Sequence, residues 1–578
     1  MFYDKNNPFV DNTSPTGGPL GGKKTLAARA HLAFQPADDL SFLLTAYDSN
    51  TEQSWGPYLF VSTRSTCTNM NGVVVVSDNG TPVPGNAAAC TAGSVPNSIV
   101  VSAPSPFFSA FGVGTAQPVP DAQRLTFNAN DAQSTGGFDR VSGGILKGEW
   151  KLGGSQLVSI TGYNVVKSHL LLDDDASALP FLNTDNFAEV KNFSEELRDF
   201  VSGDKYRWTT GLYYLHIDAT VDDIQKVLAD GVPLTGGLSL QGNSVFELVT
   251  NSYSAFTQAE FEVAPLWTLV AGARATRENK NFTFHTDDQT LAGVTFASGR
   301  TFPDAGSPPG DVHENLYAGK LQLEYRPQAG VMYYGGVNRG TKAGGFNAPF
   351  LGGPNPVDAQ VPYKPEVLYS YEVGAKTTLL DHRLRLNGAV FYYDYRDYQG
   401  FKFLNFATIV GNYAADVKGA EFDVEYRPVS ALTLSAGAAY VDSIVKNVQA
   451  GNAMVPAAVT FATRRAPFTS PWTGTALARY EWSLAAGKLS VQADVQYTGD
   501  YFQNLTNFDS TKVDAYTLLG ARVAWRDPSG KWEFSATGKN LTDKRYRTVG
   551  FDTSDFGGFS QTGYGEPRWV MGMASYRF

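Results

Sequence analysis

The chain has 578 residues, a length that would ordinarily suggest several soluble domains. Its composition argues against that organisation, because 58 residues are glycine, 13% are aromatic and only 18% are charged. A mean hydropathy of -0.21, with no apolar run of about 18 residues, excludes a bundle of transmembrane helices. A net charge of -10 argues against nucleic acid as a partner.

The start of the chain and its two cysteines bear on the cellular compartment. The segment 1–6 has neither the basic nor the apolar region of a secretory signal, so we expect a trimmed start or one internal to a longer gene. Cys67 and Cys90 both lie in a polar stretch rich in Gly, Pro, Ser and Asn. In an oxidising compartment we expect them to form a disulfide; the alternative is two free thiols in a cytosolic protein.

Alternation of apolar and polar residues runs through most of the chain and predicts β-strands. In the segment 488–497, for example, Leu, Val, Ala, Val and Tyr alternate with Lys, Ser, Gln, Asp and Gln. Charges gather on one side of such strands, and Tyr or Trp stands near their ends, where an interfacial aromatic girdle would lie. These strands therefore suit a sheet with lipid on one face and water on the other.

The connections between the predicted strands fall into two classes. Short turns containing Pro, Gly or Asp are predicted at 35–38, 153–154, 202–205, 264–265, 326–328, 380–382, 427–430, 484–487 and 527–530. Long polar stretches lie between them at about 51–140, 221–244, 281–312, 341–362, 443–469, 500–512 and 543–563. Short turns at one end and long loops at the other are typical of bacterial outer-membrane barrels, and no blade-like or rung-like repeat is present. The sequence predicts an all-β, antiparallel transmembrane β-barrel.

The turns also predict how many strands there are and which way they run. Nine short turns join about eighteen strands, and the C-terminal strand makes about nineteen, with the first strand near Thr25–Phe34. The last strand alternates and ends on Tyr576 and Phe578, which resembles the terminal signal that the barrel assembly machinery recognises. Single-chain bacterial barrels have even strand numbers with both ends in the periplasm, so we expect missing strands at the N-terminus.

Several segments from about residue 140 to the end resemble the barrel of TonB-dependent outer-membrane receptors of the iron-complex type. The most specific is Asn540-Leu541-Thr542-Asp543-Lys544-Arg545-Tyr546, close to the family's signature at the end of the penultimate strand. Other segments that agree in order and spacing are 193–198, 272–278, 338–347, 364–366, 371–376 and 567–568. The resemblance implies a barrel of 22 strands preceded by a signal peptide, a TonB-binding segment and a globular plug. We expect residues 1–578 to be the barrel domain, without those N-terminal parts and without the first strands.

Candidate site residues are few. Arg339 and Lys342 lie in a Gly-rich segment predicted to be a loop, and with Phe346 and Tyr363 they are candidate contacts for an anionic or aromatic ligand. The alternative is that this loop determines barrel geometry and its charges face water. Charged residues expected to line the lumen as ladders are Glu195, Glu196, Arg198, Glu372 and Lys376. We predict no metal site at His285 and His313, because their spacing fits no standard pattern, and no catalytic or cofactor site.

These observations lead to one hypothesis and two alternatives. We expect a bacterial outer-membrane barrel, in contact with outer-membrane lipid, for uptake of a ferric siderophore or a similar scarce nutrient. In a full-length family member, the TonB–ExbB–ExbD complex would drive uptake; without a plug, we expect no energised transport. The alternatives are a passive pore or non-transporting remnant, and a secreted β-rich binding protein. The sequence does not identify the substrate.

Overall fold

The computed structural model describes residues 2–8, 10–12, 18–54, 59–62, 66–68, 74–76, 126–127, 136–173, 182–227, 240–291, 294–348, 357–404, 407–450, 460–507, 511–552 and 559–577. Among these residues, no helix is long and apolar enough to cross a membrane.

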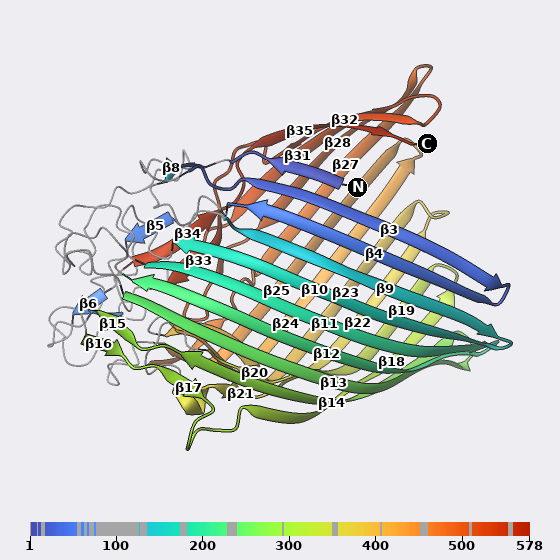
Figure 1. Cartoon of the computed structure of the whole chain (residues 1–578). Helices are drawn as coiled ribbons and strands as arrows, with labels where there is room; N and C mark the ends of the chain where they lie inside the picture. Colours follow the sequence, from blue (N-terminus) through green and yellow to red (C-terminus); the bar gives the residue numbers. More distant parts are fainter. Residues whose placement is uncertain are drawn as a thin grey trace.

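One antiparallel sheet forms the wall of the molecule, and its long, tilted strands pair in the order in which they occur in the chain (Figure 1). The sheet contains 22 strand segments within the described residues. Two of them, β17 (Arg300–Phe302) and β26 (Thr460–Arg465), extend the pairing of β14 and β25 beyond the ends of β18 and β27. The other wall strands, from one edge of the sheet to the other, are β1 (Phe2–Asn6), β3 (Lys23–Ala37), β4 (Leu40–Gln53), β9 (Phe138–Leu152), β10 (Ser155–Asp173), β11 (Leu182–Gly203), β12 (Tyr206–Val227), β13 (Leu240–Ala264), β14 (Trp267–Thr286), β18 (Asp311–Gln328), β19 (Val331–Lys342), β22 (Glu366–Leu379), β23 (Leu384–Leu404), β24 (Ala407–Val429), β25 (Leu432–Ala450), β27 (Trp472–Leu484), β28 (Gly487–Thr498), β31 (Tyr516–Arg526), β32 (Trp532–Lys539) and β35 (Trp569–Tyr576).

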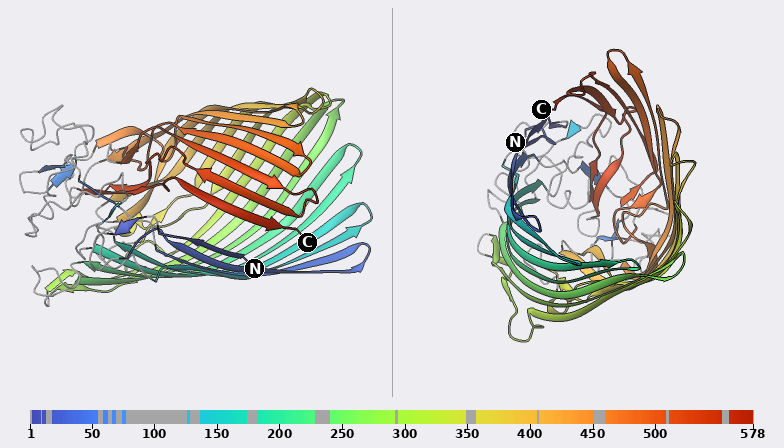
Figure 2. Two further views of the ribbon diagram at one scale, coloured as in Figure 1. Left: turned by 90° about the horizontal axis from the view of Figure 1, so that it is seen from above. Right: turned by 90° about the vertical axis from the view of Figure 1, so that its right-hand side faces the viewer.

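The sheet curls around a central axis, so that its first and last strands come near each other. Figure 2 shows the curved wall from two further sides, with the two chain ends close together. Strands β1 and β35 form the two edges, and no ladder joins them within the described ranges. This architecture confirms the predicted antiparallel β-barrel fold.

Nine tight connections join neighbouring wall strands at one end of the barrel, and each lies at a predicted short turn or, for the turn predicted at 326–328, directly after it. They lie at 38–39, 153–154, 204–205, 265–266, 329–330, 380–383, 430–431, 485–486 and 527–531. Gly330 shows why such turns need particular residues: its φ is +78°, and a Cβ there would lie 2.5 Å from the Thr378 carbonyl oxygen. Turn chemistry is local, so the sequence predicted these positions well.

Side chains alternate across the wall as the sequence predicts. On β27, the outward-facing Trp472, Tyr480 and Trp482 are exposed and stand toward the two ends of the strand. The residues between them on the same face are small. Arg479 and Glu481 point to the other side and form an ion pair of 3.3 Å. An apolar band with aromatic ends outside and charges inside is the pattern of a lipid-exposed barrel.

Two expectations about the strands need correction. The strand near Thr25–Phe34 was expected to be the first of the sheet. Strand β1 precedes it and pairs antiparallel with the outer half of β3. Strands also run well into the stretches expected to be loops: β12 ends at Val227, β13 begins at Leu240 and β14 ends at Thr286. Hairpin pairing satisfies the backbone there, and polar residues such as Asp222 and Asp223 of β12 interrupt the apolar alternation from which the strands were predicted.

Shorter segments lie at the outer end of the barrel. They are β2 (Asp11–Asn12), β5 (Leu59–Ser62), β6 (Thr66–Thr68), β7 (Val74–Val76), β8 (Thr126–Phe127), β15 (Gln289–Leu291), β16 (Val294–Ala297), β20 (Gly345–Phe346), the helical turn η4 (Asp358–Gln360), β21 (Pro362–Tyr363), β29 (Tyr501–Phe502), β30 (Lys512–Val513), β33 (Arg547–Asp552) and β34 (Phe559–Tyr564). Backbone bonds tie some of them together across long stretches of sequence, as where β34 pairs with β5. These segments build the outer mouth of the barrel.

Candidate functional site in the barrel lumen

Arg339 and Lys342 belong to strand β19, not to a loop, and they lie on opposite faces of the barrel wall. The expectation that both lie in a Gly-rich loop is wrong, because Glu366–Ser370 of β22 pairs with the chain through Lys342. Arg339 shares the outward face with Tyr333 and Val337, both exposed. Lys342 is at the lumen face of the outer mouth and is exposed. The two cations therefore cannot contact one ligand together.

Arg339 is held by aromatic neighbours on the outside of the wall. Its Nε donates a hydrogen bond of 3.3 Å to the Tyr369 hydroxyl, and its Nη1 donates to the Tyr317 carbonyl. The guanidinium carbon lies 5.8 Å from the centre of the Tyr369 ring. Arg396 lies over the same ring at 4.7 Å. This arrangement is typical of cations at the interfacial edge of an apolar band.

Phe346 and Tyr363 lie in the short β20–β21 pair at the outer mouth. The Phe346 ring stacks on Phe282 with centroids 4.9 Å apart, and Phe282 belongs to a buried cluster with Phe284 and Phe302. Burial raises the pKa of Tyr363 above its usual range. Both aromatic side chains thus hold the loop against the inside of the wall in this structure.

Gly344 is the anchor of this loop. Its N–H donates a hydrogen bond of 3.0 Å to Glu314 Oε2, and its carbonyl accepts one of 2.6 Å from Lys280 Nζ. Lys280 also pairs with Glu278 at 3.0 Å. A side chain at residue 344 would lie 2.4 Å from the Tyr363 carbonyl oxygen, so a glycine is required for this close approach. The Gly-rich segment therefore shapes the mouth of the lumen.

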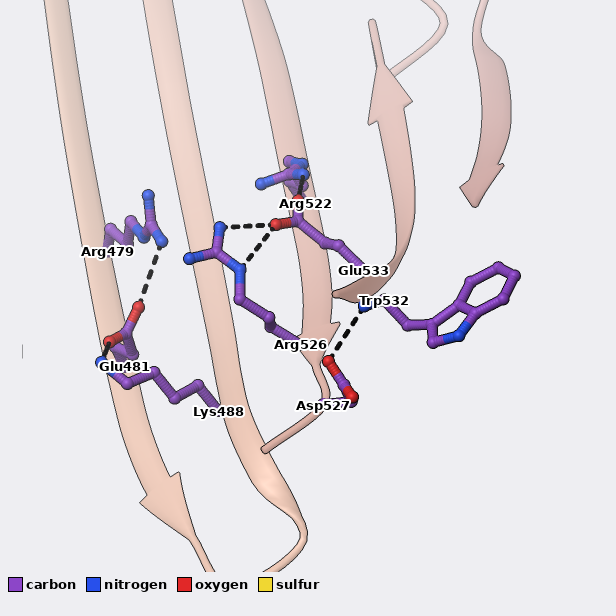
Figure 3. Close-up of polar contacts among 8 residues, drawn as sticks. All are labelled: Arg479, Glu481, Lys488, Arg522, Arg526, Asp527, Trp532 and Glu533. Carbon is purple, nitrogen blue, oxygen red and sulfur yellow. Dashed lines mark hydrogen bonds and ion pairs between the residues drawn. The ribbon is translucent and has the colours of Figure 1, made fainter. Parts of the chain in front are cut away.

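The lumen wall near the short turns carries a network of charges, shown in Figure 3. Glu533 of β32 pairs with Arg522 at 2.8 Å and with Arg526 at 2.6 Å, both on the neighbouring β31. Beside them on β27 and β28, Glu481 pairs with Arg479 at 3.3 Å and with Lys488 at 3.2 Å. Four cations face two carboxylates, so this patch, the periplasmic lumen cluster, has an excess of positive charge.

The sequence contains a signal for the periplasmic lumen cluster that apolar alternation alone does not reveal. Arg522 and Arg526 have the same parity on one strand, and the predicted turn at 527–530 places Glu533 directly opposite Arg526. That turn is held by Asp527, whose Oδ1 accepts a hydrogen bond of 2.9 Å from the Trp532 N–H (Figure 3). The Ser529 hydroxyl and turn N–H groups lower the pKa of Asp527. The cluster can be predicted from the sequence only when residues are counted across the turn to find which ones pair.

The expected lumen ladders are partly as predicted. Glu196 and Arg198 form an ion pair of 2.6 Å on the lumen face of β11. Glu372 accepts a hydrogen bond of 2.6 Å from the Tyr334 hydroxyl instead of pairing with Lys376. Glu195 corrects the expectation: it lies on the outward face beside the exposed Leu197. Alternation places neighbouring residues on opposite faces, so Glu195 and Glu196 cannot both line the lumen.

A family model described as TonB dependent receptor-like, beta-barrel, matches residues 95–541, more than half of the chain. The chain belongs to this family. Its members are barrels of the bacterial outer membrane.

Solved structures with the same fold include two receptors and a transporter. The ferric yersiniabactin uptake receptor FyuA from Yersinia pestis has a TM-score of 0.69 at 16% identity, over 99% of this chain and 73% of that protein. The siderophore receptor PiuA from Acinetobacter baumannii has a TM-score of 0.69 at 14% identity, over 99% and 76%. The copper transporter OprC has a TM-score of 0.64 at 14% identity, over 100% and 75%. At these identities the likeness concerns the fold alone.

The signature segment Asn540–Tyr546 of this TonB-dependent receptor barrel is a structural clasp. Asn540 adopts φ +47°; its Nδ2 donates to the Lys544 and Glu566 carbonyls at 2.9 and 3.0 Å, and its Oδ1 accepts from the Lys544 N–H at 2.8 Å. Asp543 Oδ1 accepts a hydrogen bond of 2.8 Å from the Arg568 N–H, which lowers the pKa of Asp543. The segment thereby joins the end of β32 to the residues that precede β35.

The remaining members of the signature support this clasp. The Leu541 N–H donates to the Leu519 carbonyl at 2.9 Å, and the Tyr546 ring stacks on Tyr516 with centroids 4.5 Å apart. Thr542 and Lys544 line a surface hollow between β28 and β31. The motif therefore positions the last strand of the receptor barrel.

Two further predictions concern residues at the edge of the described ranges. Tyr576 faces outward and packs on Trp532, with ring centroids 4.7 Å apart, whereas Phe578 lies outside the described residues. The backbone of Cys67 lies in β6, but Cys90 and the Cys67 side chain lie outside the described residues. The disulfide stays a prediction. Across the described ranges, no group of three His, Cys, Asp or Glu side chains converges to hold a metal ion.

Proposed function

We propose that this TonB-dependent receptor barrel lies in the bacterial outer membrane and serves the uptake of a ferric siderophore or a similar scarce nutrient. The observation that carries the proposal is the combination of family membership with an inward-facing wall of charged networks. FyuA, a ferric yersiniabactin uptake receptor, and PiuA, a siderophore receptor, share the fold over 99% of this chain. Ligand capture would take place at the outer mouth, where the exposed Lys342 is a candidate contact for an anionic chelate.

Energised transport would require more than the barrel wall. We propose that a plug and a TonB-binding segment, supplied by sequence N-terminal to these 578 residues, would gate the lumen and couple it to TonB–ExbB–ExbD. The periplasmic lumen cluster would face such a plug, because it lies on the lumen wall near the short turns. The 578 residues alone would therefore not accumulate substrate.

Uptake of radiolabelled ferric siderophores tests this proposal. A host that lacks its own siderophore receptors would express residues 1–578, with or without functional TonB, and would receive ferric chelates of the catecholate, hydroxamate and citrate types. We expect no TonB-dependent accumulation above the empty-plasmid control. Accumulation that requires TonB would contradict the plugless proposal.

The same cells separate the outer-membrane assignment from the transport assignment. Membrane fractionation and heat-modifiable gel mobility report whether the chain forms a barrel in the outer membrane. A soluble, non-modifiable protein would overturn the location and favour a secreted binding protein. The Glu533→Gln variant leaves Arg522 and Arg526 without their carboxylate. Its fractionation and gel mobility, compared with those of the wild type, report whether the barrel still forms without these ion pairs.

A further inference from the structure

His169, on the outward face of β10, has both ring nitrogens next to groups that accept hydrogen bonds. Its Nδ1 is 2.9 Å from the carbonyl oxygen of Gly136, and its Nε2 is 2.7 Å from Oδ1 of Asp185 on β11. A neutral imidazole carries one N–H and can donate to only one of these oxygens. With Asp185 ionised, both contacts are therefore hydrogen bonds only when the ring is a doubly protonated imidazolium.

His285 shows that a histidine beside a carboxylate need not be charged. Its Nε2 faces Asp287 at 3.2 Å, but its Nδ1 faces the Thr301 hydroxyl at 3.0 Å. A hydroxyl can donate as well as accept, so a neutral ring satisfies both contacts. In three further histidines Nδ1 also faces a hydroxyl or a side-chain amide, groups that can supply a hydrogen: His31, His216 and His313.

The surroundings of His169 carry an excess of negative charge. Carboxylates face it from the strands around it: Asp185 of β11, Asp222 of β12, Asp173 of β10 itself and Glu52 of β4. On the same face, Lys226 of β12 lies farther from the membrane, and the other cations have carboxylate partners: Lys24 with Glu52, Arg140 with Asp48, and Lys167 and Lys191 with Glu189. Among the described residues, neither Asp185 nor Asp222 forms an ion pair with a lysine or arginine. This environment favours the charged ring.

The Gly136 contact lies where the chain enters β9. His169 occupies the last position at which β10 pairs with β9, opposite Phe138. Next to it, the Gly137 carbonyl accepts a hydrogen bond of 3.0 Å from the N–H of Gln53, at the end of β4. His169 therefore fastens an outer corner of the wall at which β4, β9, β10 and β11 meet.

We infer that His169 is a pH-sensitive latch on the outer rim of the barrel. The protonated ring ties Gly136 to Asp185, and loss of one proton breaks one of the two hydrogen bonds. Because the latched state holds the proton, the latch is complete in acid and opens as the pH rises through about 5 to 8, where histidine usually loses its charge. In the proposed outer-membrane location this corner meets the external medium, so external pH would control its order.

Hydrogen exchange of the folded barrel tests the inference. Residues 1–578, in detergent and with heat-modifiable mobility, would be labelled at pH 5.5 and at pH 8. Mass spectrometry would follow the peptides that contain Gln53 and residues 137–142, with each rate divided by the intrinsic rate at that pH. We expect the protection of these peptides in the wild type to fall about tenfold from pH 5.5 to pH 8, as the loss of one charge-assisted hydrogen bond predicts.

Asp185→Asn separates the latch from other effects of pH. An asparagine amide can donate to Nε2 of a neutral ring while Nδ1–H still donates to the Gly136 carbonyl, so this variant should keep its protection at both pH values. Asp223, on the lumen face of β12, is unchanged in this variant, so its titration cannot imitate the latch. His169→Phe should be poorly protected at both pH values. The matched control is His285→Phe, which should respond to pH as the wild type does.

Equal protection of the wild type at the two pH values overturns the inference. A tenfold pH response that persists in Asp185→Asn or in His169→Phe overturns it as well, because the response would then come from another group. If His169→Phe lacks heat-modifiable mobility, Asp185→Asn decides. Exchange is measured on the folded barrel without any substrate, so the result does not depend on the outcome of the uptake experiment, and fractionation tests the outer-membrane location separately.

Discussion

At the scale of single residues, Asp223 is an acid buried on the outer extension of β12. The outward face of β12 carries Trp208 and Leu212 and becomes polar at Asp218 and Thr220, so Asp223 lies beyond the apolar band. Burial raises the pKa of Asp223 to about 6, against partial compensation by the amide donors of Asn186 and Gln225. The folded state therefore holds this proton more tightly than the unfolded state does.

Asp223→Asn should change how stability depends on pH. Because the folded pKa is the higher one, the wild type loses stability as pH rises from about 4 to about 6, by at most about 3 kcal/mol. The asparagine variant should lack most of that slope. The slope is measured from the temperature at which heat-modifiable mobility is lost, determined at several pH values from 4 to 8. Asp204→Asn, in an exposed turn, is the control, and an unchanged slope in Asp223→Asn would contradict the assignment.

At the scale of elements, the hairpin is the repeating unit of this molecule. Each of the nine short turns sets the register of two strands, and the register then decides which charges meet on the lumen face. The β31–β32 hairpin illustrates this, because the turn at 527–531 places Arg526 opposite Glu533. Long outer connections have no such local rule, so their packing depends on contacts such as Phe346 against Phe282.

A double-mutant cycle on this hairpin should give a modest coupling energy. Arg526→Gln and Glu533→Gln, alone and together, should reveal about 0.5 to 1 kcal/mol, because water in the lumen screens the pair and Arg522 still bonds Glu533. Urea unfolding in detergent followed by tryptophan fluorescence measures it. The exposed pair Lys24 and Glu52, at 3.2 Å, is the control and should show coupling near zero. If the coupling energy of Arg526 and Glu533 is no larger than that of the control pair, the ion pair does not stabilise the β31–β32 hairpin and the prediction is wrong.

At the scale of the whole molecule, the wall described here surrounds a lumen whose inner face is polar. A barrel with this many wall strands and no plug should behave as an open pore. We expect residues 1–578, refolded until they show heat-modifiable mobility, to pass large, steady currents in planar lipid bilayers. A folded sample that never conducts would show that the lumen is obstructed or that β1 and β35 do not close the wall; heat-denatured protein is the control.

The sequence by itself determined the barrel, its nine tight turns and its family, because alternation and turn chemistry are local properties that every strand repeats. The tertiary structure decided which way individual side chains face. Arg339 and Lys342 turned out to lie on opposite faces, and Glu195 on the outside, since one residue of register moves a side chain across the wall. It also decided that Gly136 and Asp185 meet at His169, because neighbours across a sheet are set by pairing and not by distance along the chain.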